Sequence, residues 1–186
     1  MKRALFSRDE MMRMNIETLN DRGVKVDEIA EIAYAQQSKW TDQVSRADCR
    51  ESVEKILSLR DTFHLLQLGA EIDRLTEENK IREPLREILN SDLGLFGIDE
   101  LFGLELAGLF GTIGKTNFGD IDVNKPSVVA RLNYGGKQDT EKCHTFLDDI
   151  VGAIAAAAST RVAQIANELE ARKDPKYKDI KLDLEI

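Results

Sequence analysis

The chain has 186 residues, of which 42% are hydrophobic and 32% are charged, and its formal net charge is -8. This length can bury one sizeable core, and the acidic balance argues against a nucleic-acid partner, which normally requires a basic face. With three prolines and long stretches rich in Ala, Leu, Glu, Arg and Gln, the composition predicts an all-α fold, a single-domain helical bundle with an N-terminal helical appendage.

Cysteine usage and hydropathy indicate the compartment. Cys49 and Cys143 lie far apart and lack the spacing of a disulfide framework. No apolar segment follows the basic residues at positions 1–6, so we expect no signal peptide. The most apolar window, residues 93–114, contains three acidic residues and falls short of a span of roughly 18 apolar residues. We therefore expect a cytoplasmic protein without a transmembrane segment, whose membrane contact is peripheral, at the inner face of the cell membrane.

Residues 1–90 are expected to form the N-terminal helical region. The predicted elements are a helix over residues 7–20, a second helix with Asp27 as its N-cap, a long amphipathic run over residues 46–79, and a short helix from Pro84 through Leu89. The polar residues at 90–92 form a break, which marks the boundary of this region.

Residues 91–172 are expected to form the helical core, and residues 173–186 a C-terminal tail. The predicted elements are a helix that ends near Phe110, a loop or broken helix over the glycine-rich segment 111–124, a short helix from Pro126 that stops before Gly135, and a long helix from Phe146 to about Arg172. The alternating apolar residues at 180–186 predict a short strand or an arm that docks on a partner subunit. Together with the small residues at 152–158, they lead us to expect a homo-oligomer.

Three acidic centres lie in the otherwise apolar stretch 97–152. They are Asp99-Glu100, Asp122 and Asp148-Asp149. Carboxylates are seldom buried unless they are paired or hold a metal, and hard oxygen ligands suit Mg²⁺, or alternatively Mn²⁺, better than zinc. Structural interpretations exist as well, since Asp99 can cap the following helix and Asp148 can complete a capping box with Thr145. Asp149 has no such structural role.

Lysines beside these acids can contact a phosphate. Lys125 follows Asp122 closely and supplies a cation for a phosphate oxygen, and Lys115 with the backbone N–H groups around it can do the same. The residues by themselves leave two interpretations open, metal-dependent phosphate chemistry and a purely structural bundle.

Three ordered blocks resemble the phosphatidylglycerophosphatase A family. The blocks are Gly97-Ile-Asp-Glu-Leu-Phe-Gly103, Phe118-Gly-Asp-Ile-Asp-Val-Asn-Lys-Pro126 and Cys143-His-Thr-Phe-Leu-Asp-Asp-Ile-Val-Gly-Ala153. They correspond to the Trp-Asp-Glu-Phe-x-Gly, Asp-x-x-Lys-Pro and Asp-Asp-hydrophobic-hydrophobic blocks of the membrane-embedded members. The chain is most similar to the soluble Gram-positive branch, which includes the low temperature requirement C proteins of Listeria. It lacks the spanning helices and the N-terminal Pro-Gly-Thr-x-Gly motif of the integral members.

The resemblance implies an Mg²⁺-dependent phosphatase that converts phosphatidylglycerophosphate to phosphatidylglycerol and phosphate at the membrane surface. The implied metal ligands are Asp99, Glu100, Asp122, Asp148 and Asp149, and the residues assigned to catalysis are Asp149, Asp122, Glu100 and Lys125. We expect the helices with Asp99 and Asp149 to face each other across one or two metal ions, while a loop with Asp122 and Lys125 closes the site. Direct attack by water and an aspartyl-phosphate intermediate both stay open. The alternatives are an Mg²⁺-dependent hydrolase of a soluble phosphate or nucleotide, and a non-catalytic interaction protein.

Overall fold

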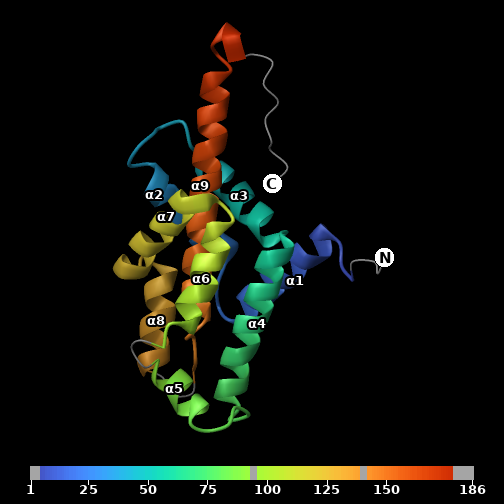
Figure 1. Ribbon diagram of the computed structural model, residues 1–186, viewed down its shortest axis with the longest axis vertical. Helices are drawn as coiled ribbons and strands as arrows, with labels where there is room; N and C mark the ends of the chain where they lie inside the picture. Colours follow the sequence, from blue (N-terminus) through green and yellow to red (C-terminus); the bar gives the residue numbers. More distant parts are fainter. Residues whose placement is uncertain (1–4, 93–95, 139–141, 178–186) are drawn as a thin grey trace.

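A computed structural model describes residues 5–92, 96–138 and 142–177 (Figure 1), and within these ranges the chain forms nine α-helices, one short 3-10 helix and no strand. The elements are α1 (Arg8–Asp21), α2 (Val26–Gln37), α3 (Arg46–Leu57), α4 (Arg60–Glu77), α5 (Leu85–Ser91), α6 (Ile98–Gly108), α7 (Gly111–Asn124), α8 (Val128–Gln138), α9 (Leu147–Ala171) and η1 (Pro175–Tyr177). None of the helices in the described ranges is both long enough and apolar enough to cross a bilayer.

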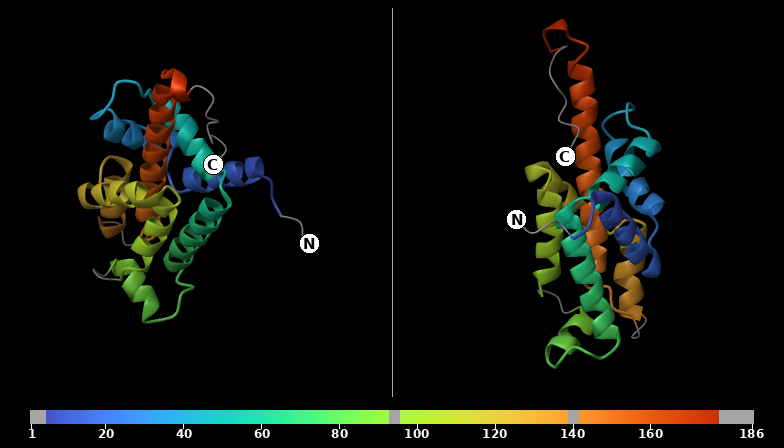
Figure 2. Two further views of the ribbon diagram at one scale, coloured as in Figure 1. Left: turned by 45° about the horizontal axis from the view of Figure 1, so that its top comes forward. Right: turned by 90° about the vertical axis from the view of Figure 1, so that its right-hand side faces the viewer.

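Helix α9 is the axis of the bundle, and α2, α3, α4, α6, α7 and α8 all contact it (Figures 1 and 2). Every residue from 147 to 162 is buried, because apolar and small side chains cover all faces of this half of the helix. The small side chains allow close approach: a Cβ atom at Gly152 would lie 3.2 Å from the Cγ2 atom of Ile121 on α7. Beyond residue 162, α9 projects out of the bundle and its side chains are mostly exposed (Figure 2).

One hydrophobic cluster joins helices from both parts of the chain. Leu19 and Ile56 from the first helices belong to the same cluster as Leu106 and Ile150 from the later ones. Burial of apolar surface is the dominant favourable contribution to folding, so the early and late helices stabilise each other. The predicted all-α bundle is confirmed, while a division at residue 90 stays a prediction.

The glycine-rich segment that was expected to be a loop or a broken helix is a regular helix, α7, so that prediction is wrong. Its glycines lower helix propensity, but Phe118 and Ile121 are buried in the core, and this packing outweighs the local preference. Gly114 is also needed for the packing itself, because a Cβ atom there would lie 2.1 Å from the carbonyl oxygen of Ala107 on α6. Gly114 therefore lets α6 and α7 approach each other closely.

Other boundaries differ from the sequence-based expectations. The run over residues 46–79 is divided at Ser58 and Leu59, and α2 begins at Val26 with Lys25 rather than Asp27 as its N-cap. Helix α5 begins directly after Pro84 and ends at Ser91. Helix α8 continues through Gly135 to Gln138. Leu59 adopts extended backbone angles (φ -76°, ψ 142°), which end one helix and start the next. A glycine within a helix costs only about 1 kcal/mol, so Gly135 does not end α8. The alternating segment 180–186 lies outside the described residues.

Candidate functional site

The ends of three helices bring the predicted acidic residues together. Asp99 and Glu100 lie in the first turn of α6, Asp122 lies in the last turn of α7, and Asp148 and Asp149 lie in the first turn of α9. Gly97 precedes α6 as its N-cap with a φ of 68°, a left-handed conformation that favours glycine. Asp122 was expected on a loop, and its helical position follows from the regular structure of α7.

Asp99, Glu100 and Asp149 form the tightest group, which we call the carboxylate trio. Each of them offers an oxygen atom, and these three atoms lie within 4.8 Å of one another. The Asp99 and Asp149 residues are each only 4% exposed, and Glu100 is half-buried. Oε2 of Glu100 is buried and has no hydrogen-bond partner among the described residues. One oxygen of Asp99 accepts the N–H of Glu100 at 3.0 Å.

Electrostatics make the carboxylate trio unfavourable without a cation. Burial raises the pKa of Asp99 well above its usual range, and the side chain of Glu100 raises it further. Burial likewise raises the pKa of Asp149, with the charge of Asp148 as the next largest cause. Buried oxygen ligands with an excess of negative charge are the donor set that Mg²⁺ and Mn²⁺ prefer. The residues of the trio therefore fit a divalent cation.

Lys125 holds the other two acids together with Asp149. Its Nζ donates to Oδ1 of Asp122 at 2.6 Å, to Oδ2 of Asp148 at 3.2 Å and to Oδ1 of Asp149 at 3.5 Å. Burial alone would lower the pKa of Lys125, but the carboxylates of Asp148, Asp122 and Asp149 raise it above its usual range. The side chain of Asn133 on α8 donates to the same oxygen of Asp148 at 3.1 Å. Lys125 therefore remains an ammonium in this cluster.

The geometry separates the five predicted acids into two groups that share one member. Asp149 belongs to the carboxylate trio and also contacts Lys125, whereas Asp122 and Asp148 belong to the lysine group. The expected opposition of Asp99 and Asp149 is present in the structure. The metal-binding and catalytic roles of the individual residues stay predictions.

Two expectations for neighbouring residues do not hold. The hydroxyl of Thr145 donates to the carbonyl of Leu89 at 2.7 Å and Phe146 is the N-cap of α9, so the capping box proposed for Asp148 is wrong. Lys115 precedes Lys125 by ten residues on α7, about 15 Å along the helix axis, and so lies away from the cluster.

Asp73 is a buried acid that we did not assign from the sequence. It lies on α4, is fully buried, and accepts the backbone N–H of Phe146 at 3.2 Å and of Leu147 at 3.1 Å. Burial raises its pKa to about 8, and the two N–H groups oppose this shift. A signal was present, because Asp73 occupies an apolar position of the amphipathic run, three residues after the buried Ala70. Asn133, by contrast, had no sequence signal.

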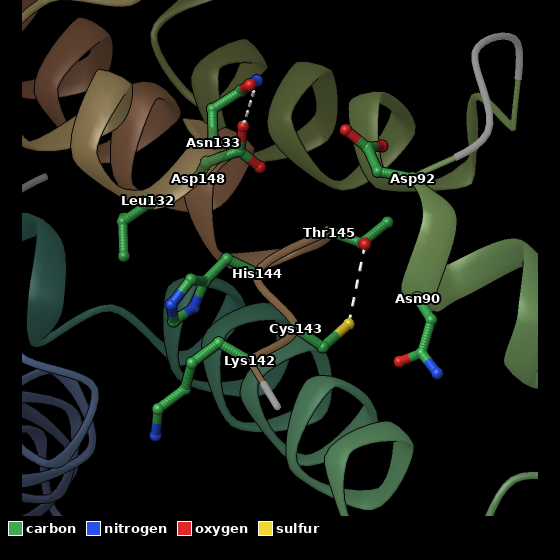
Figure 3. Close-up of a pocket in the computed structure, with 9 residues that line it drawn as sticks. All are labelled: Asn90, Asp92, Leu132, Asn133, Lys142, Cys143, His144, Thr145 and Asp148. Carbon is green, nitrogen blue, oxygen red and sulfur yellow. Dashed lines mark hydrogen bonds between the residues drawn. The ribbon is translucent and has the colours of Figure 1, made fainter. Parts of the chain in front are cut away.

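A small hollow beside Asp148 has about 10 Å³ of free space, enough for one water molecule (Figure 3). It is lined by Asn90, Asp92, Leu132, Asn133, Lys142, Cys143, His144, Thr145 and Asp148. A wider surface hollow of about 530 Å³ also includes Lys142 and His144 in its lining, and it contains Arg22 and Arg131. The small hollow borders the first turn of α9 at Asp148, and both hollows are lined by Lys142 and His144.

Known proteins similar to this chain share both its sequence and its fold. A family model described as phosphatidylglycerophosphatase A matches residues 25–164. YutG of Bacillus subtilis is 41% identical over 152 residues, which cover 82% of this chain and 90% of YutG. The structure of the low temperature requirement C protein from Listeria monocytogenes matches with a TM-score of 0.80 at 38% identity, covering 84% of this chain and 97% of that protein. YpjQ from Bacillus subtilis matches with a TM-score of 0.81 at 36% identity, covering 88% of this chain and 99% of YpjQ.

The range matched by the family model, residues 25–164, includes all three acidic centres as well as Lys125. The chain belongs to the phosphatidylglycerophosphatase A family, in the Gram-positive branch represented by the low temperature requirement C protein.

Proposed function

We propose that the protein is a divalent-metal-dependent phosphatase that hydrolyses the phosphomonoester of phosphatidylglycerophosphate at the membrane surface, releasing phosphatidylglycerol and phosphate. The observation that carries the proposal is the carboxylate trio, whose oxygen atoms lie within 4.8 Å of one another beside the ammonium of Lys125. Family membership supports the substrate class.

Asp99, Glu100 and Asp149 are the residues that would hold Mg²⁺, or alternatively Mn²⁺. A cation bound there would polarise a phosphoryl oxygen and stabilise the charge of the leaving alkoxide. Asp122 and Asp148 support this arrangement from the other side, because they hold the ammonium of Lys125 next to Asp149.

Lys125 would contribute a hydrogen bond and a positive charge to the phosphate. Its ammonium has three donors, and the longest of its three contacts is the one to Asp149 at 3.5 Å. A phosphate oxygen can replace that contact while Asp122 and Asp148 keep the ammonium in place. Charge developing on the phosphoryl oxygens is then stabilised by a group already oriented toward it.

Glu100 is placed to accept a proton from the attacking water. Its Oε2 is buried and has no donor among the described residues, so a water molecule can donate to it without displacing another hydrogen bond.

Phosphate release from phosphatidylglycerophosphate in mixed micelles tests the proposal. We expect release to require Mg²⁺, to stop on chelation, and to fall by about 100- to 1,000-fold in Glu100→Gln, the loss typical for one removed catalytic group. Glu105→Gln is the matched control, because Glu105 lies on the same helix but is exposed and outside the carboxylate trio. Asp149→Asn, which changes the shared acid, should reduce release to background.

A comparison of substrates tests the lipid substrate separately from the assignment as a phosphatase. Faster release from glycerol phosphate or from nucleotides than from the lipid would replace the lipid substrate by a soluble one and leave the phosphatase assignment in place. Absence of release from any phosphomonoester with millimolar Mg²⁺ or Mn²⁺, or full activity in Glu100→Gln, would contradict the proposed chemistry.

A further inference from the structure

Two carboxylates of α4 hold the segment that leads into α9. Asp73 accepts the N–H groups of Phe146 at 3.2 Å and Leu147 at 3.1 Å, while Oε1 of Glu77 accepts the N–H of Cys143 at 2.9 Å. Asp73 and Glu77 are four residues apart, so they lie on the same face of α4, toward this segment. The entry of α9 is therefore bound to a helix from the first half of the chain.

Asp73 supplies the cap that α9 lacks locally. The first N–H groups of a helix have no partner within the helix, and a polar N-cap residue usually provides one. Phe146 occupies the N-cap position of α9 and makes no such hydrogen bond with its side chain, which instead packs against the ring of Phe102 with centroids 5.1 Å apart. The two carboxyl oxygens of Asp73 lie at the positive end of the helix and accept its first N–H groups in place of an N-cap side chain.

The two hydrogen bonds between Asp73 and adjacent N–H groups fix both the position of the first turn of α9 and its rotation about the helix axis. Asp148 and Asp149 directly follow Leu147, so the rotation of the first turn decides where both carboxylates point. A side-chain atom lies about 5 Å from the helix axis, and a rotation of about 20° would move it by roughly 2 Å. A shift of that size would separate the carboxylate of Asp149 from the other two members of the carboxylate trio and from Lys125.

We propose that Asp73 is a positioning residue for the acidic site, because its hydrogen bonds to Phe146 and Leu147 fix the first turn of α9 and so direct Asp148 and Asp149. The inference rests on the proposed function, since it assumes that these acids bind a metal. Among the described residues, Asp73 makes no hydrogen bond or ion pair with the carboxylate trio or Lys125, and its proposed action runs through the backbone of α9.

Mn²⁺ binding without substrate, measured by calorimetry, gives the first test. Asp73→Asn keeps the size of the side chain, but it retains a single oxygen acceptor and turns an amide N–H₂ toward the second backbone N–H. We expect the Mn²⁺ affinity to fall by about 10- to 100-fold, as for other groups that orient metal ligands. We also expect kcat to fall by about 100-fold while KM changes little, because a misplacement of about 1 Å affects the reacting geometry more than binding.

The matched control is Leu66→Ala, a change at a fully buried position of α4 two turns before Asp73. This variant should lose stability but keep the Mn²⁺ affinity and the kcat of the wild type. Wild-type Mn²⁺ affinity and kcat in folded Asp73→Asn would overturn the proposal. If Asp73→Asn does not fold, Asp73→Glu replaces it, because the longer side chain keeps the carboxyl group but displaces the acceptor atoms. Wild-type values in Asp73→Glu would also overturn the proposal.

A spectroscopic measurement separates this inference from the proposed function. If the wild-type protein binds no Mn²⁺ and releases no phosphate, the proposed function fails. The carboxyl ¹³C shifts of Asp148 and Asp149 still report their surroundings, and we expect them to change in Asp73→Asn but not in Leu66→Ala. Unchanged shifts in Asp73→Asn would overturn the positioning role by themselves.

Discussion

Asp149 is the residue on which the two halves of the acidic site depend. It shares the carboxylate trio with Asp99 and Glu100, and it also accepts from Lys125. A single ammonium cannot balance the five carboxylates at the three helix ends, so an excess of negative charge remains when all are ionised. An uncompensated buried charge is costly, and a divalent cation at the trio removes this cost.

The buried thiols give a prediction that does not depend on the acidic site. Burial raises the pKa of Cys49 to about 11, and burial followed by the charge of Asp73 raises the pKa of Cys143 to about 12. Because the thiolate is the reactive form, both residues should resist a thiol reagent such as DTNB at about pH 8 in the folded protein and react quickly in denaturant, where thiol pKa values return to about 8.5. The rate at about pH 9 should still follow unfolding, since both folded pKa values lie above that pH.

Single-thiol variants assign the reactivity. Cys49→Ala leaves Cys143 as the reporter, and Cys143→Ala leaves Cys49. Fast labelling of either variant at about pH 8 and without denaturant would show that its remaining thiol is accessible in the native protein, contrary to its burial.

At the scale of the helices, two of the three glycines of α7 lead to opposite predictions. A Cβ atom at Gly114 would lie 2.1 Å from the backbone oxygen of Ala107, whereas a Cβ atom at Gly119 would meet nothing within 4 Å. We expect Gly114→Ala to lower the free energy of unfolding by about 3 kcal/mol, because backbone atoms cannot yield as a flexible side chain can. Gly119→Ala should raise it by about 0.5–1 kcal/mol through helix propensity. Urea unfolding of both variants measures these values, and equal effects would contradict the close approach of α6 and α7.

The same helix shows how far the sequence predicts the fold. The boundary signals of α1, which are acids at its start and Gly23 after its end, and the alanine-rich stretch of α9 predicted those helices nearly to their ends, because local preference and packing agree there. In α7 they disagree: four residues with low helix propensity, Gly111, Gly114, Thr116 and Gly119, conceal a helix that tertiary contacts stabilise. Gly114 is required by the packing of α7 against α6, whereas no neighbouring atom requires a glycine at position 119.

The acidic site was predictable where its residues stand in compact sequence blocks. The trio and Lys125 lie within three short blocks, and the acids in these apolar blocks together with the family resemblance suggested a common site. The role of Asp73 was not predictable, because its partners at positions 146 and 147 lie more than seventy residues away and are backbone groups. Backbone donors have no sequence signature, so a remote cap of this kind is visible only in the folded structure.

For the whole molecule, α9 connects the site with the rest of the bundle. Its first half lies in the common core and carries the acidic pair, while its second half projects beyond the other helices (Figure 2). The exposed side chain of Leu169 lies on this projecting part. The small residues at 152–158, which led us to expect a homo-oligomer, are buried within one chain. The homo-oligomer stays a prediction, and its test is the mass of the protein in solution.

A cation at the carboxylate trio should stabilise the whole fold, because it binds only where α6 and α9 meet. A ligand at about 100 times its dissociation constant adds about 2.7 kcal/mol, which for a chain of this length corresponds to a rise in Tm of roughly 5–10 °C. Thermal unfolding with millimolar Mg²⁺ and with sodium chloride at equal ionic strength measures the specific part of this rise. Asp149→Asn should show a higher Tm than the wild type without metal, since one carboxylate of a crowded buried group is neutralised, and almost no further rise with Mg²⁺. An equal rise in the variant and the wild type would place the bound cation elsewhere, and the absence of any rise in the wild type would contradict metal binding at the trio.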